Sequence, residues 1–119
     1  MSACERIFSV SEFIRPSEGD PARSVVLETE DSVIVVWHAH PGQEIAAHVN
    51  PHGQDTWTVL TGSAAYYQGQ GEVRKLKAGE VAVAKKGQVH GAINTDKKEP
   101  FIFVSVVAPG NAGFVLNEK

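Results

Sequence analysis

The sequence predicts an all-β fold, a sandwich or barrel of short strands, and three observations lead to this prediction. The apolar runs are short and rich in valine, isoleucine and aromatic residues. Glycine, proline and small polar residues interrupt these runs at intervals of roughly 8–12 residues, which is typical of sandwiches and barrels. No segment keeps a helical period, because the best candidate, Val10–Arg15, is short and ends at Pro16. At 119 residues the chain is expected to form one domain.

The N-terminal part, residues 1–23, is expected to be an arm and a surface loop, and the barrel is expected over residues 24–117. The first two strands are expected at SVVLE (24–28) and SVIVVWHAH (32–40), joined across the acidic run ETED. A proline-glycine pair ends the second strand, because proline lacks a donor for the strand ladder and glycine frees the turn.

The middle of the chain predicts a hairpin and a further strand. DTWTVLT (55–61) and AAYYQ (64–68) flank Gly62-Ser63, and two apolar strands around such a pair favour a hairpin. A glycine-rich turn, GQGE, then leads to the expected strand VRKLK (73–77).

The C-terminal part supplies the remaining strands, EVAVA (80–84), QVHGAIN (88–94), FIFVSVV (101–107) and a last short one, FVLN (114–117). FIFVSVV is apolar on both faces. This pattern fits a strand buried between two sheets, or one with one face in the core and the other at a dimer interface. Burial in the core is the primary interpretation of this strand, and a homodimer that covers its second face is the secondary expectation.

Composition narrows the function classes. The formal net charge is −3 and the pI about 5.9, which favours neither nucleic acid nor an anionic membrane as a partner. The single cysteine, Cys4, excludes an intrachain disulfide and is expected to be an inert thiol. Glu5 and Arg6 stand where a signal peptide needs an apolar stretch, and no run is long enough to span a bilayer. These features predict a cytoplasmic protein whose partner is a small-molecule ligand.

Side chains suited to metal binding are concentrated in one short segment. His48, His52 and Asp55 lie within eight residues, and His90 follows at the end of another predicted strand. Imidazole and carboxylate together suit a divalent transition metal, whether Fe, Mn, Ni, Zn or Cu. Alternation along a strand places His48 and Asp55 on adjacent strands facing one interior, with His52 in the loop between them.

The spacing of these residues resembles the cupin superfamily, in particular its small single-domain members. Cupins carry the motifs G-x5-H-x-H-x3,4-E-x6-G and G-x5-P-x-G-x2-H-x3-N. Here Gly42 precedes His48 by five intervening residues, and six residues separate Asp55 from Gly62. The second motif keeps every spacing, at Gly79, Lys85, Gly87, His90 and Asn94, although Lys85 stands where the family has proline.

The resemblance implies an antiparallel jelly-roll (double-stranded β-helix) barrel with a metal ion at its centre. It implies His48 and His90 as metal ligands, with Asp55 at the position of the family's glutamate and Asn50 at that of its second histidine. Asn is a poor ligand for a transition metal, so His52 is the expected replacement, which makes the ligand set His48, His52, Asp55 and His90.

Each of these residues also has a structural interpretation. His48 and His90 could be interior histidines hydrogen-bonded within a metal-free pocket. Asp55 could accept hydrogen bonds in the turn or orient His48. His52 could lie at the barrel mouth, and Asn50 could bond to nearby backbone ahead of Pro51.

Further residues are candidates for lining a ligand pocket, namely Asn50, Trp57, His38, His40 and Tyr66. Trp57 shares a face with Asp55 and would shield the carboxylate from solvent, although core packing is its ordinary role. Tyr66 is expected to pack in the core, with its hydroxyl as an alternative ligand donor.

The sequence thus predicts a cupin-like protein with a divalent transition metal in the barrel centre. Two activities fit such a centre, a small-molecule dioxygenase and an isomerase or lyase. A non-catalytic module that binds or senses a small molecule, with or without metal, is the alternative. No catalytic residue is assigned, since the only acid or base candidates are Glu44, His38 and His40.

Overall fold

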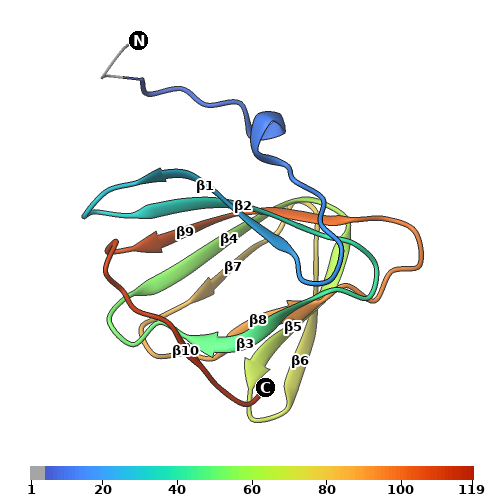
Figure 1. The fold of residues 1–119 in the computed structure, drawn as a ribbon. Coiled ribbons are helices and arrows are strands. Elements are labelled where there is room, and N and C mark those ends of the chain that lie inside the picture. The colour runs from blue at the N-terminus through green and yellow to red at the C-terminus, as the bar shows by residue number, and fades with distance from the viewer. Residues whose placement is uncertain (1–4) are drawn as a thin grey trace.

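A computed structural model, which describes residues 5–119, shows two antiparallel sheets that face each other across one interior (Figure 1). The strands are β1 (Ala22–Glu28), β2 (Val33–Ala39), β3 (Glu44–Val49), β4 (Gln54–Thr61), β5 (Ser63–Gly69), β6 (Glu72–Lys77), β7 (Val81–Ala84), β8 (His90–Ile93), β9 (Phe101–Ala108) and β10 (Val115–Leu116). A single turn of 3-10 helix, η1 (Val10–Phe13), lies in the N-terminal arm. The prediction of an all-β fold is confirmed.

The strand order interleaves distant parts of the chain. One sheet has the order β1-β2-β9-β4-β7 and the other β10-β3-β8-β5-β6. Strands that follow each other in sequence, such as β3 and β4, therefore often lie in opposite sheets. This alternation winds the chain around a central axis and brings side chains from both sheets toward one interior, as a jelly-roll barrel does.

One strand was predicted without bounds. The sequence placed His48 on a strand but gave that strand no first residue, because the segment of β3, EIAAHV, contains two alanines, which have low β propensity. It nevertheless pairs with β8 and β10. Strand β1 begins at Ala22, two residues before the predicted barrel boundary. Cys4 lies outside the described residues.

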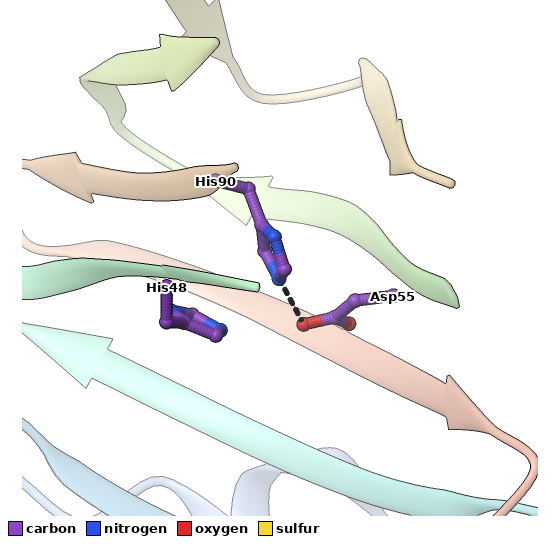
Figure 2. A group of neighbouring side chains, drawn as sticks. All are labelled: His48, Asp55 and His90. Atoms are coloured by element: carbon purple, nitrogen blue, oxygen red, sulfur yellow. Dashed lines mark hydrogen bonds and ion pairs between the residues drawn. The ribbon is translucent and has the colours of Figure 1, made fainter. Parts of the chain in front are cut away.

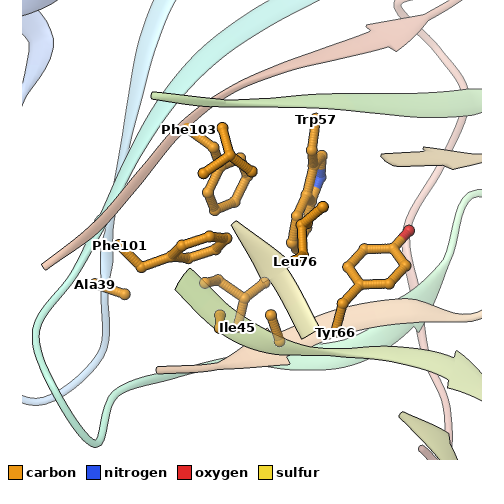
Figure 3. Close-up of a cluster of buried hydrophobic side chains, with 10 residues drawn as sticks. Ala39, Ile45, Trp57, Tyr66, Leu76, Phe101 and Phe103 are labelled. Atoms are coloured by element: carbon orange, nitrogen blue, oxygen red, sulfur yellow. The ribbon is translucent and has the colours of Figure 1, made fainter. Parts of the chain in front are cut away.

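A cluster of apolar side chains fills one end of the interior (Figure 3). Trp57 stacks on Phe103 with ring centroids 4.0 Å apart, and the edge of Tyr66 meets Trp57 at 5.3 Å. Phe101, Ile102 and Phe103 of β9 are all buried, as expected for a strand that is apolar on both faces. This cluster closes one end of the barrel and leaves the polar interior residues toward the other.

The described part of the chain contains little helix. Its one helical element is the four-residue η1. Within residues 5–119 no helix has both the length and the apolar character that crossing a membrane would require.

Candidate metal centre

Three buried side chains converge in the interior, His48 from β3, Asp55 from β4 and His90 from β8 (Figure 2). Each can offer one ligand atom, and these atoms all lie within 4.8 Å of one another. All three side chains are at most 5% exposed. A first-row divalent ion takes ligands of this kind, so the group has the composition of a metal centre.

The two histidines come together because their strands pair. His48 and His90 are direct partners in the β3–β8 register, and their rings lie 4.1 Å apart. Strand β8 approaches β3 closely at Gly91, where a Cβ atom would lie 2.7 Å from the carbonyl oxygen of Ile45. Asp55 reaches the pair from the opposite sheet. The expected adjacency of the His48 and Asp55 strands is thus corrected, because the turn between them crosses from one sheet to the other.

Both imidazoles are held in the same way. Nδ1 of His48 lies 2.8 Å from the carbonyl oxygen of Ala46, and Nδ1 of His90 lies 3.1 Å from that of Gln88. A carbonyl oxygen only accepts, so each Nδ1 carries a hydrogen. In the neutral ring Nε2 then carries no hydrogen, and its lone pair is free to bind a metal.

Asp55 accepts two hydrogen bonds and lies close to a third polar atom. The indole N–H of Trp57 donates to Oδ2 at 3.0 Å, the Ser105 hydroxyl donates to Oδ1, and Nε2 of His90 lies 3.1 Å from Oδ2. These contacts orient the carboxylate toward the histidines. The sequence signal for Ser105 was its position as the one hydroxyl in the apolar run FIFVSVV, on the same strand face as Phe101 and Phe103.

The electrostatic environment keeps His48 neutral. Burial lowers the pKa of His48, and the neighbouring His90 lowers it further. The pKa of the Tyr66 phenol is raised instead, mainly by burial and then by the charge of Asp55. A neutral imidazole beside a carboxylate is the protonation state that metal binding needs.

Asn50 lies beside the three ligand candidates and has an unpaired oxygen. Its side-chain N–H donates to the carbonyl oxygen of Gly113 at 2.8 Å, which fixes the orientation of the amide. Its Oδ1 atom is buried and has no hydrogen-bond partner within residues 5–119. Asn50 lines the same cavity as His48 and Asp55. A buried, unpaired oxygen is costly unless something binds it.

His52 is not brought into this group. Its side chain is exposed, and its backbone N–H donates to the carbonyl oxygen of Ala112 at 2.8 Å. The turn packs so tightly that a Cβ on Gly53 would lie 2.4 Å from the carbonyl oxygen of Ala108. The chain therefore presents His52 to solvent, contrary to the expectation that it would replace the family's second histidine.

The other polar candidates lie away from the centre. Trp37 and Ala39 face the core, so alternation turns His38 and His40 to the outer side of β2, with His38 buried and His40 exposed. Glu44 bonds to Tyr67 and to Lys119 instead, and the Tyr67 hydrogen bond lowers its pKa. Neither the HxH pair nor Glu44 is positioned as an acid or base for the centre.

A cavity of about 500 Å³ opens beside His48 and Asp55. This volume is within the usual range for small-molecule sites. Its lining residues are Arg23, Glu28, Val33, Val35, Trp37, His48, Asn50, Asp55, Ser105, Val107, Gly110, Gly113 and Phe114. Trp57 and Tyr66, which were pocket candidates, lie instead in the apolar cluster. Arg23 and Phe114 were missed, because only the folded sheets place the two chain ends around one cavity.

Known proteins share this architecture. A protein from Klebsiella pneumoniae described as an uncharacterized conserved protein with a double-stranded β-helix domain is 72% identical and has a TM-score of 0.93, covering 97% of this chain and 99% of that one. An RmlC-like cupin protein from Desulfovibrio desulfuricans is 25% identical, with a TM-score of 0.75 and coverage of 88% and 97%. A search among proteins of curated function found no match. The family profile of the cupin domain matches residues 35–107, so the chain belongs to the cupin family and has its double-stranded β-helix fold.

Proposed function

We propose that this cupin binds a divalent transition metal through His48, His90 and Asp55 and uses it to bind a small oxygen-bearing molecule in the adjoining cavity. The observation that carries the proposal is the convergence of three buried ligand atoms within 4.8 Å. Two of them, Nε2 of His90 and Oδ2 of Asp55, are 3.1 Å apart. Ligand atoms about 2.1 Å from one ion and at right angles to each other lie about 3.0 Å apart, so this spacing fits a shared ion.

Asn50 supports the proposal as a fourth, weaker ligand. Its unpaired Oδ1 is the kind of neutral oxygen that completes a coordination shell, and the hydrogen bond to Gly113 holds the amide in one orientation. This gives a set of two imidazoles, one carboxylate and one amide oxygen. The set fits the group that the family resemblance implies, with Asn50 rather than His52 at the second position.

The remaining residues define what such a centre can do. A bound metal would supply Lewis-acid polarisation of a ligand oxygen. Trp57 and Ser105 hold the Asp55 carboxylate, and the backbone carbonyls of Ala46 and Gln88 hold the two imidazoles. Phe114 stacks on His48 with the ring centroids 4.6 Å apart. The choice between a dioxygenase and an isomerase or lyase stays a prediction, as do the homodimer and the cytoplasmic location.

Metal analysis of untagged protein tests the proposal. The wild type is stripped with chelator, reconstituted separately with Mn, Fe, Ni, Cu and Zn, and compared with the double variant His48→Ala/His90→Ala. The matched control is His40→Ala/His52→Ala, which removes two exposed histidines. We expect one metal per chain in the wild type and the control and none in the first variant. Equal metal content in both double variants would refute the proposed centre.

A second candidate, a metal-free binding barrel, is favoured by the direct contact between His90 and Asp55. Because His90 already donates from Nδ1, its Nε2 can donate to Asp55 only as an imidazolium. Such an ion pair would satisfy both groups without a metal. Folded wild-type protein that takes up none of the five ions would select this candidate.

A further inference from the structure

We propose that Arg23 is the specificity-determining residue of the cavity and that the molecule bound there is a small monocarboxylic acid with an apolar body. This inference rests on the proposed metal centre, which would hold an oxygen of the ligand at the other end. Arg23 is the one permanently charged cation among the described residues that line the cavity.

The strand register positions Arg23 relative to the metal centre. Arg23 pairs with Trp37, and Trp37 pairs with Phe103, so these residues form one row across neighbouring strands of the first sheet. This row faces the interior, and the Arg23 side chain therefore extends from the interior face. The row that contains Asp55 passes through Val107, four residues further along β9 than Phe103. At 3.2–3.4 Å per residue the two rows are separated by about 13 Å along the strands. Arg23 and the centre thus lie at opposite ends of one cavity.

The guanidinium is available for a ligand. Within residues 5–119 it makes no ion pair, and its side chain is exposed at the cavity mouth. Glu28, which also lines the cavity, is the acidic residue to consider as an ion-pair partner of Arg23. It pairs with Val33, and Val33 pairs with Val107, so Glu28 lies in the row of Asp55 and not in that of Arg23. Arginine presents two parallel N–H donors that match a carboxylate.

The surrounding surface limits the ligand further. Between the two ends the wall is formed by apolar side chains, among them Val35, Trp37 and Val107. An apolar body therefore replaces water there favourably. Two carboxylates, Glu28 and Asp55, face the same cavity and would repel a dianion such as a phosphate monoester more than a monoanion.

Hydroxamates test the inference, because the hydroxamate group binds the metal and leaves the other end of the molecule free. The probes are the monohydroxamates of succinic, glutaric and adipic acid, each compared with its methyl ester on metal-loaded protein. We expect at least one acid to bind about tenfold more tightly than its ester, as for one charge-assisted pair near the surface. In Arg23→Gln that ratio should fall to about one while the esters bind as in the wild type.

Two further variants make the result specific. Arg23→Lys keeps the charge but not the two parallel donors and should retain only part of the preference. Glu28→Gln removes a negative charge that faces the same cavity, so the preference for the acid should persist or increase. An equal affinity for acid and ester in the wild type, or a preference that survives in Arg23→Gln, would overturn the role of Arg23 and leave the metal centre intact. Failure of the esters and acids alike to bind metal-loaded protein would show that the ion is closed to the cavity and would overturn this inference, whereas the metal analysis alone decides the centre.

Discussion

Nε2 of His90 lies 3.1 Å from Oδ2 of Asp55, although the two residues are 35 positions apart and belong to opposite sheets. The contact is buried at both ends, with relative side-chain exposures of 1% and 5%. A buried carboxylate is tolerated only when it is paired or hydrogen-bonded, and Asp55 has His90, Trp57 and Ser105 as its partners.

The first prediction concerns the stability that Asp55 provides. Asp55→Ala leaves the indole N–H of Trp57 and the hydroxyl of Ser105 without their acceptor in the buried interior. We expect the free energy of unfolding to fall by about 2–4 kcal/mol, measured by urea denaturation of metal-free protein. Glu72→Ala, at an exposed position, should change it by less than about 0.5 kcal/mol. Similar small losses in both variants would contradict the proposed network.

The second prediction separates Asn50 from His52. Asn50→Ala removes a buried oxygen beside the centre, whereas His52→Ala removes an exposed ring. We expect metal affinity, measured by competition with a chromogenic chelator, to fall by about tenfold or more in Asn50→Ala and to stay near the wild-type value in His52→Ala. The opposite order would return His52 to the ligand role that the sequence suggested.

The third prediction is a pH dependence that arises from His38. Burial, and then the neighbouring His40, lower the pKa of His38 below its ordinary value of 6.5, and its Nδ1 has no partner within residues 5–119. The unfolded chain therefore binds a proton more readily than the folded one. Stability is present in full above about pH 6.5 and is lost as the pH falls toward the lowered pKa of the folded state.

We therefore expect His38→Gln to lose less stability than the wild type between pH 7 and pH 5, measured by thermal unfolding of metal-free protein. His52→Gln, which changes an exposed histidine, is the control and should follow the wild-type curve. Parallel curves for the wild type and His38→Gln would show that burial of His38 has no such effect.

The fourth prediction concerns the close approach of β8 to β3. A Cβ at Gly91 would lie 2.7 Å from the carbonyl oxygen of Ile45 and 2.9 Å from Cα of Ala47, both backbone atoms that cannot rotate away. We expect Gly91→Ala to destabilise the protein by about 1–3 kcal/mol and to weaken metal binding, because His48 and His90 depend on this strand pairing. Ala46→Ser, at an exposed position of β3, adds an atom without such a clash and should change neither quantity.

The amino-acid sequence by itself determined the fold class and three residues of the candidate centre. Short β-branched and aromatic runs between turn residues are a local property, since side-chain alternation and turn chemistry act over a few positions. The spacing of Gly42, Gly79 and the residues that follow them singled out His48, Asp55 and His90. The same local reasoning placed His48 on a strand but gave no bounds for β3, whose alanines have little intrinsic preference for strands.

Only the tertiary structure showed that Asn50 is buried and His52 is exposed, and it alone brought Arg23 to the cavity. Both outcomes depend on contacts between distant segments. Packing of the Gly53 turn against Ala108 directs His52 to solvent, and the β1–β2 register turns Arg23 inward. Hydrophobic burial and strand pairing across the whole barrel set these contacts, and no local pattern encodes which side of a turn will face another part of the chain.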